Sequence, residues 1–307
     1  MSPQAIFLYE IDESFGPNIL AQYFLIKQEL PKSVLTDFIK KHVEKEFKSA
    51  LSQKDGVRYF SNKIDTESLE KKNLYLGFIL KEEEDMVSIK SIFETIEEKI
   101  LKAYTPDKDK MEVILKDSLN SILSLMEKLK EPAIIVDTIN NKTKKMIDEG
   151  NLQEARELID LGEEIPEKLA AEIKLAEDYL NEKAYKKAKK SYLKAAELAE
   201  SIQEYEIVSF LRYKAEEIGT LPDLIKESEQ LYKDVNGLID LLQENQLHLY
   251  HELNRPLNRL INISSSFEEE EKVSKLAHIL SYSNQADRIA KELFNLDKKI
   301  KDSMENL

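Results

Sequence analysis

The chain has 307 residues, of which 45 are Lys or Arg and 59 are Asp or Glu, giving a formal net charge of −14. Phosphate binding needs clustered Lys and Arg, so this acidic chain without a dense basic stretch is not expected to bind nucleic acid or an anionic membrane surface. The absence of cysteine excludes disulfides, thiolate nucleophiles and Cys-ligated metal sites.

Glycine spacing and hydrophobic run length exclude further classes. No two of the seven glycines lie closer than 12 residues in the sequence, so no glycine-rich loop is present to cradle a phosphate. The first 20 residues lack the features of a signal peptide, and no apolar run of 18 residues occurs. We therefore expect a cytoplasmic protein without a membrane span, built from two or three globular units.

Residues 1–130 are predicted to form an α+β domain. Turn residues at 12–18 separate the first two apolar segments, which predicts a β-hairpin. The predicted strands are 5–11, 19–26, 57–64 and 74–80. Pro31 opens a helical pattern of apolar residues that reaches Phe47, and amphipathic helices are expected at about 86–103 and 110–129. His42 falls on the charged helix after Pro31 and is expected at the surface.

This order of elements, with an apolar first strand running into Asp12-x-x-x-Gly16-Pro17, resembles the longin (profilin-like) family. The resemblance implies a five-stranded antiparallel sheet with helices on its faces. It also implies an interaction module for a small GTPase or for another longin-like domain. No contact residue can be transferred to this sequence from the family, and an unrelated α+β domain is the alternative.

Residues 132–219 are rich in Ala, Glu, Lys and Leu, which predicts a helical segment. An offset of 33 residues relates Ala155 to Ala188 and Met146 to Tyr179. Small residues at the helix crossing resemble the second helix of a tetratricopeptide repeat, with one good copy at about 172–200. A plain antiparallel helical hairpin is the alternative to a peptide-binding solenoid, and Leu221-Pro222 is expected to break the helix.

Residues 222–307 are predicted to contain a coiled coil, with one long helix over 223–263. Apolar residues and one asparagine step by four and three at Leu231, Val235, Leu238, Leu242, Asn245 and Leu249. Asn245 would be a polar core position. Beyond Leu249 two consecutive steps of four indicate a stutter near His251.

The residues at this stutter read His251-Glu252-Leu253-Asn254-Arg255-Pro256-Leu257-Asn258. They resemble the H-box of the histidine-kinase dimerisation and phosphoacceptor domain, usually His-Glu-Leu-Arg-Thr-Pro-Leu. After a linker that contains residues 264–266 and 268–271, a second helix repeats apolar residues at heptad spacing. These are Ile279, Tyr282, Ala286, Ile289, Leu293, Leu296 and Ile300. The resemblance implies a helical hairpin that forms a dimeric four-helix bundle, and hence a homodimer.

The resemblance makes His251 the phosphoacceptor and Glu252 its acid/base neighbour. Helix geometry agrees independently, because His251 is about 200° from Leu249 and from Leu253 and would face water if they face the core. An exposed neutral imidazole is a nucleophile toward phosphorus. Pro256 cannot donate a hydrogen bond to the carbonyl four residues back and is expected to bend the helix.

Departures from the family motif restrict this role. Asn254 replaces the usual basic residue and Arg255 replaces the residue used for dephosphorylation. The chain also ends about where an ATP-binding domain would begin, so we expect no complete kinase active site and no bound cofactor. Three possibilities remain: exchange of phosphate with a receiver-domain protein, phosphorylation by a separate kinase, or a dimerisation module without phosphate chemistry.

A metal site is the weakest alternative. His248 and His251, three residues apart, could share a metal with Glu252 or His278, but a solvated pair is favoured and no metal is expected. The acidic run Glu82–Asp85 is interpreted as a solvated turn.

The sequence therefore supports two hypotheses. The first is a cytoplasmic signal-transduction protein that presents His251 for phosphotransfer. The second is a non-enzymatic dimeric scaffold that binds a small GTPase or a longin-like partner through residues 1–130.

Overall fold

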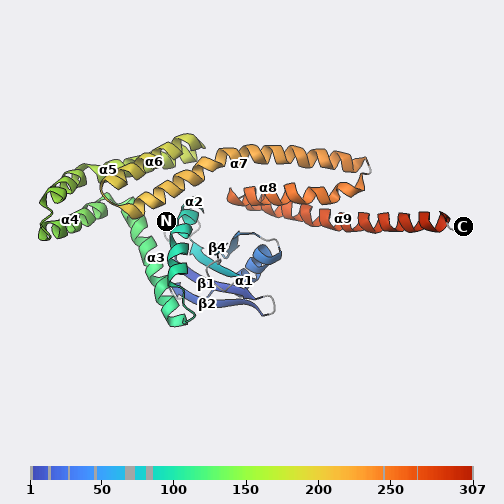
Figure 1. Ribbon diagram of the computed structural model, residues 1–307, viewed down its shortest axis with the longest axis horizontal. Helices are drawn as coiled ribbons and strands as arrows, with labels where there is room; N and C mark the ends of the chain where they lie inside the picture. The colour runs from blue at the N-terminus through green and yellow to red at the C-terminus, as the bar shows by residue number, and fades with distance from the viewer. Residues whose placement is uncertain are drawn as a thin grey trace. The chain divides into compact units, whose positions relative to one another are not determined.

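The computed structural model describes residues 3–12, 15–26, 28–44, 47–65, 73–80, 86–244, 246–267 and 269–305. It divides into two compact units, Met1–Gly219 and Thr220–Leu307 (Figure 1). The predicted helical middle, 132–219, thus belongs to the same compact unit as the sheet. The acidic run Glu82–Asp85 and the predicted core residue Asn245 lie outside the described residues.

The first unit begins with a five-stranded antiparallel sheet in the order β2-β1-β5-β4-β3. The strands are β1 (Ala5–Asp12), β2 (Gly16–Phe24), β3 (Ser49–Lys54), β4 (Val57–Lys63) and β5 (Leu74–Leu80). The predicted α+β fold and the β1–β2 hairpin are therefore confirmed. Strand β3 was missed because Ser-Ala-Leu-Ser-Gln-Lys contains no β-branched or aromatic residue.

One face of the sheet is covered by α1 (Lys32–Ile39). Alternate residues of β1, including Phe7 and Tyr9, pack with Phe38 of this helix in one apolar cluster. Beyond α1 the chain forms a π-helical turn, η1 (Lys40–Glu44), so the prediction of one helix reaching Phe47 is wrong. Phe47 is buried past the end of this turn, with its amide donating to the carbonyl of Lys41 at 2.9 Å.

The other face is covered by α2 (Met86–Ala103) and α3 (Lys108–Lys130), close to the predicted ranges. The remaining β1 residues, such as Ile6 and Leu8, pack with these helices. Asp107 caps α3, because its carboxylate accepts hydrogen bonds from the amides of Asp109 and Lys110. Both faces are thus buried, which explains the unbroken apolar runs of β1 and β5.

The helices that follow are α4 (Pro132–Asp148), α5 (Leu152–Asn181), α6 (Tyr185–Ser201) and α7 (Tyr205–Gln243). The turns after α4 and α5 have the same hydrogen bonds: Asn151 donates to the carbonyl of Met146, and Ala184 to that of Tyr179, both at 2.8 Å. The 33-residue offset thus relates two structurally alike turns. Pro222 lies inside α7, so the predicted helix break at this proline is wrong.

The second unit contains the end of α7, the 3₁₀ helix η2 (Leu247–Leu253), α8 (Asn254–Ser266) and α9 (Glu270–Glu305). The predicted single helix over 223–263 is therefore wrong. Helix α7 ends at Gln243, and Arg259 of α8 forms a bidentate ion pair with Glu227 of α7 at 2.7 Å. Leu257 and Leu260 of α8 are fully buried in this arrangement.

A helical hairpin is present at the C-terminal end of the chain, because α8 and η2 pack on α9. Ser264–Ser266 lies in α8 rather than in a linker, with Ser264 buried, so the connection is shorter than predicted. Residue 268 lies outside the described residues. In the described part of the chain, no helix has the length and apolar character needed to cross a membrane.

Candidate functional sites

His251 lies in η2, immediately before α8, with its side chain 54% exposed. The imidazole is thus exposed as predicted, but it lies in a 3₁₀ helix rather than in the predicted long helix. Its Nδ1 is 2.8 Å from the carbonyl oxygen of His248, and its Nε2 is 3.1 Å from Oε1 of Glu252. The structure therefore brings the predicted pair His251 and Glu252 together.

Both ring nitrogens of His251 face hydrogen-bond acceptors. A carbonyl oxygen can only accept, so a hydrogen bond to it uses the proton on Nδ1, and the neutral ring then has its lone pair on Nε2, beside Glu252. An imidazole that attacks phosphorus needs a free lone pair. In this tautomer Nε2 is the nitrogen that could attack, and Glu252 is the carboxylate next to it.

Pro256 is the third residue of α8. Amides in the first turn of a helix have no intrahelical acceptor, so the proline costs no hydrogen bond there. Pro256 therefore lies in the first turn of α8 rather than inside the long helix that was predicted.

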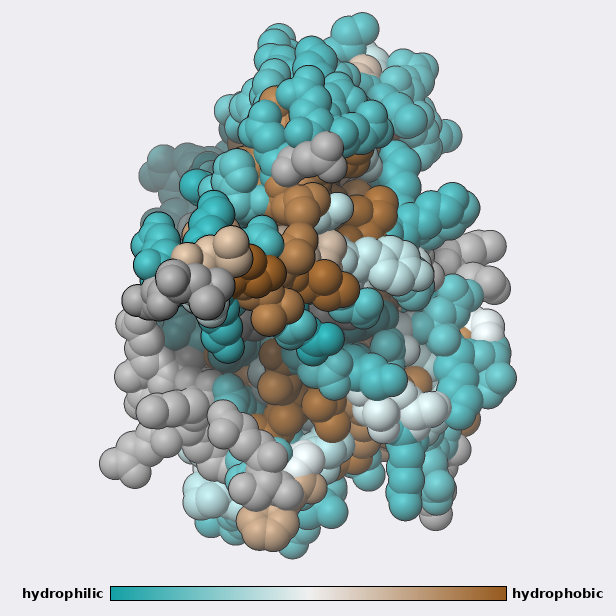
Figure 2. Space-filling model, turned by 90° about the vertical axis from the view of Figure 1, so that its right-hand side faces the viewer, coloured by the Kyte–Doolittle hydropathy of each residue, from teal (hydrophilic) through white to brown (hydrophobic). Residues whose placement is uncertain are grey.

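The apolar heptad positions of α9 form a continuous line that we call the α9 stripe. Its members are Ile279, Tyr282, Ala286, Ile289, Leu293, Leu296 and Ile300. The six large ones are between 43% and 67% exposed. Every residue from 291 to 305 is exposed. Figure 2, seen from the side toward which α9 points in Figure 1, shows exposed hydrophobic residues on a largely hydrophilic surface.

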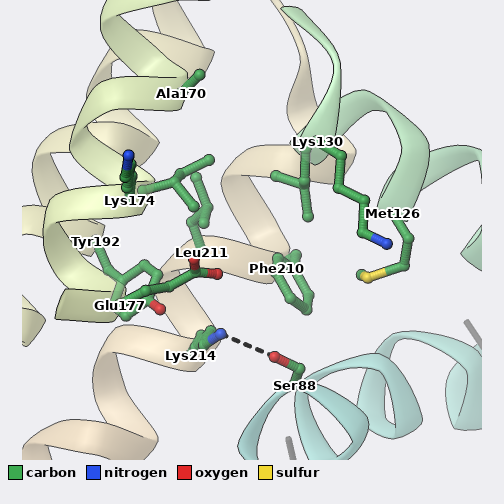
Figure 3. Close-up of a pocket in the computed structure, with 12 residues that line it drawn as sticks. Ser88, Met126, Lys130, Ala170, Lys174, Glu177, Tyr192, Phe210, Leu211 and Lys214 are labelled. Atoms are coloured by element: carbon green, nitrogen blue, oxygen red, sulfur yellow. Dashed lines mark hydrogen bonds between the residues drawn. The ribbon is translucent and has the colours of Figure 1, made fainter. Parts of the chain in front are cut away.

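The first unit holds a pocket of about 460 Å³, within the size range of small-molecule sites (Figure 3). Helices α2, α3, α5, α6 and α7 line it. Lys214 Nζ donates to Ser88 Oγ at 2.8 Å across the pocket, and both side chains are buried. Lys174 and Glu177 lie at its exposed rim.

The Ser88–Lys214 pair has the residue types of a Ser–Lys nucleophilic dyad, in which a neutral lysine takes the serine proton. The Lys214 Nζ also lies 4.9 Å from the centre of the Tyr192 ring. We interpret the pair as part of the helix packing, because both side chains are buried where these helices meet. Sequence analysis missed Lys214, although its place between the buried residues Leu211 and Ile218 on one helix face was a usable signal.

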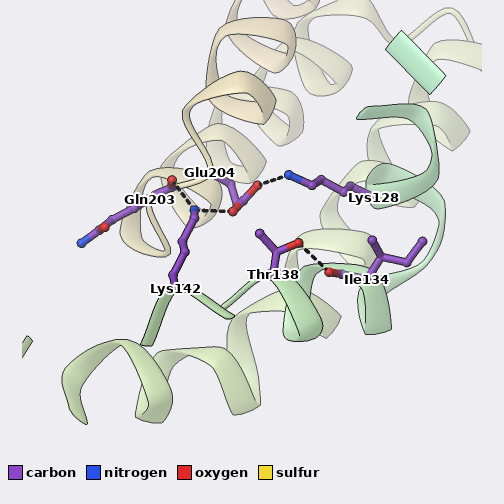
Figure 4. A network of polar contacts seen from close by, with 6 residues as sticks. All are labelled: Lys128, Ile134, Thr138, Lys142, Gln203 and Glu204. Atoms are coloured by element: carbon purple, nitrogen blue, oxygen red, sulfur yellow. Dashed lines mark hydrogen bonds and ion pairs between the residues drawn. The ribbon is translucent and has the colours of Figure 1, made fainter. Parts of the chain in front are cut away.

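A second polar cluster joins three helices near the turn between α6 and α7 (Figure 4). The buried carboxylate of Glu204 accepts from Lys128 of α3 at 2.8 Å and from Lys142 of α4 at 2.5 Å. Lys142 also donates to the carbonyl of Gln203 at 2.9 Å. Every charge in the cluster has a partner of opposite sign. We therefore interpret the cluster as a structural contact that holds these elements together.

His42 is the buried residue of η1, so its predicted surface position is wrong. Its Nδ1–H donates to the carbonyl of Phe47 at 2.6 Å, and its Nε2 lies 3.0 Å from Ser61 Oγ. Ser61 Oγ in turn lies 2.7 Å from the hydroxyl of Tyr9. Desolvation by burial lowers the pKa of His42 to about 4, which keeps the ring neutral at pH 7.

The described residues contain no group of three or more His, Asp or Glu side chains placed to hold a metal ion. Comparison of the chain with family models, curated proteins and solved structures gave no match. By its fold the chain is an antiparallel sheet with helices, followed by an all-helical region.

Proposed function

We propose that the chain is a non-enzymatic scaffold that associates with itself through α9 and offers residues 1–130 as a recognition domain. The observation that carries the proposal is the α9 stripe, whose six large residues are 43% to 67% exposed. Most of the stability of a helix in a protein comes from packing of its apolar face, and residues 291–305, the end of α9, are all exposed. A partner for this segment would supply the missing contacts.

The polar clusters elsewhere also favour a scaffold over an enzyme. The Glu204 cluster and the His42 cluster are buried, and their hydrogen bonds join elements of the fold. The antiparallel sheet with helices on both faces supports the longin resemblance. The partner class that this resemblance implies is a small GTPase or another longin-like domain.

The association is tested by measuring the mass of the full chain in solution by light scattering. Leu296→Glu places a charge on the α9 stripe and should yield a monomer. Phe294→Glu is the matched control, because Phe294 is 70% exposed on the same helix but lies outside the stripe. A wild-type monomer at high concentration, or equal loss of association in both variants, would contradict the proposal.

Phosphotransfer through His251 is the second candidate, favoured by the exposed imidazole in contact with Glu252. The purified chain is incubated with labelled ATP and an extract containing active kinases. Acid-labile label present in the wild type and absent from His251→Gln would support the site. Equal labelling of both proteins would exclude His251 as the acceptor.

A further inference from the structure

We infer that the partner of the α9 stripe is the same stripe of a second copy, aligned antiparallel. This inference rests on the proposed self-association and adds the orientation and register of the two helices. It begins from the heptad, in which Leu293 and Ile300 occupy a positions and Ile289 and Leu296 occupy d positions.

The stripe is separate from the face of α9 that packs in its own unit. Leu276 and Ser283 are buried on that face, where the Ser283 hydroxyl donates to the carbonyl of Tyr250 at 2.8 Å. At about 100° per residue, the centre of the stripe lies roughly a third of a turn away. A second helix can therefore pack on the stripe without displacing α8 or η2.

Charges beside the stripe distinguish the two possible orientations. In a parallel, in-register pair each g position faces an e position five residues later on the other helix. Glu292 would then face Asp297 of the other copy, twice in the dimer. Like charges in these positions oppose that arrangement, and the other g–e pairs, Gln285 with Ala290 and Lys299 with Met304, contribute no ion pair.

The antiparallel arrangement turns the same charges into attractions. When Leu293 faces Leu296 of the other copy, Ile289 faces Ile300, and each of these contacts occurs twice. The flanking g positions then place Glu292 beside Lys299, also twice, while Asp297 faces Ala290. Within one chain Glu292 lies 4.0 Å from Arg288, and its side chain is 69% exposed and accessible to the second helix.

The charges beside the stripe are thus complementary in only one of these two orientations. A two-fold axis passes between Leu293 and Leu296, so both copies contribute the same surface. The paired segment runs from Ala286 to Ser303, which are opposite each other across the interface, so it contains the stripe from Ala286 to Ile300 and leaves Ile279 and Tyr282 outside. This places the two α8–α9 hairpins at opposite ends of the paired segment.

Charge reversal in the full chain tests the orientation, with the dissociation constant measured by analytical ultracentrifugation. Glu292→Lys should weaken an antiparallel dimer about tenfold, because the introduced lysine would face Lys299 of the other copy. The double variant Glu292→Lys/Lys299→Glu should restore the affinity. In a parallel dimer the single variant would instead bind more tightly, because its new lysine would face Asp297, and that result would overturn the inference.

Cross-linking gives an independent readout, since the chain has no native cysteine. Ala286→Cys and Ser303→Cys are prepared separately and treated with a short bismaleimide. The antiparallel pair should cross-link only when the two variants are mixed, because identical positions would lie about 26 Å apart. Cross-links within either variant alone, or none in a dimeric mixture, would overturn the inference. A monomeric wild type would instead show that self-association itself is absent.

Discussion

At the scale of single residues, His42 couples the stability of the sheet to pH. Its neutral ring accepts a hydrogen bond from Ser61 while donating to Phe47, and burial depresses its pKa to about 4. The unfolded chain, with an ordinary histidine pKa near 6.5, binds the proton first as the pH falls. The contribution of His42 to the free energy of unfolding is therefore fully present above about pH 6.5 and is lost progressively as the pH falls toward 4.

The expected loss from His42 over this interval is about 3 kcal/mol of unfolding free energy. This loss is measured by hydrogen exchange of peptides from β1 and β5. The exchange is followed from pH 7 to pH 4 and corrected for intrinsic exchange rates. His42→Gln should be less stable at pH 7 but should show a shallower dependence on pH. Parallel curves for the two proteins would assign the acid sensitivity to other groups.

Gly77 shows that one missing side chain can be required by packing. A Cβ at this position would lie 2.1 Å from the ring of Phe7 on the neighbouring strand. Gly77→Ala should therefore destabilise the protein by about 1–3 kcal/mol, seen as a lower thermal midpoint. Phe7→Leu in the same chain should recover part of this loss.

Gly237→Ala is the matched control for Gly77→Ala. Gly237 lies in α7, and a Cβ there would meet nothing within 4 Å. The alanine should raise stability by up to about 1 kcal/mol, because glycine is unfavourable in a helix. A loss of stability of the same size in both variants would contradict the packing argument.

At the scale of elements, Glu204 connects helices α3 and α4 to the turn between α6 and α7 through Lys128 and Lys142. Glu204→Gln removes the charge that Lys128 and Lys142 share, leaving two partly buried ammonium groups without their carboxylate. We expect a loss of about 2 kcal/mol, less than for a fully buried pair, because Lys142 is one-third exposed. Urea unfolding followed by circular dichroism measures this loss.

Glu200→Gln provides the comparison for the Glu204 variant. Glu200 pairs with Arg212 at 2.6 Å, but both side chains are 49% exposed. Exposed pairs contribute roughly 0–1 kcal/mol, so this variant should unfold at nearly the wild-type urea concentration. Equal losses in the two variants would show that burial does not decide the energy of these pairs.

The elements that could be predicted from the sequence are those in which local pattern and burial agree. Helix α2 and strand β5 were predicted with the bounds that the structure has, since their apolar spacing matches one period. The long helix over 223–263 was wrong because its heptad pattern continues across the break between α7 and η2. A heptad pattern shows which face of a helix is apolar. It does not show whether the segment that packs on this face belongs to the same chain.

The candidate site was predictable only in part. The exposure of His251 and its contact with Glu252 agree with the sequence argument, although they arise in a 3₁₀ helix. Pro256 was expected to bend a helix because the start of α8 was not recognised at Asn254. The contacts of Lys214 and Glu204 were missed because their partners, Ser88 and Lys128, lie on helices far away in the sequence.

At the scale of the whole molecule, self-association and the folding of the C-terminal end of α9 should be coupled, so that this end of the helix is stable only in the dimer. Residues 291–305 form about four turns of helix, all exposed. Since packing supplies most of the stability of a helix in a protein, contact with the second copy should stabilise this end of α9. Amide exchange in this segment should then be slow above the dissociation constant of the dimer and fast below it.

Hydrogen exchange at several protein concentrations measures this coupling. Leu296→Glu should show fast exchange over 291–305 at every concentration, whereas Phe294→Glu should behave as the wild type does. Peptides from α8 provide the internal reference, because Leu257 and Leu260 are buried within the same chain. If exchange over 291–305 is slow at all concentrations, the helix is stable alone and the exposed stripe does not require a partner.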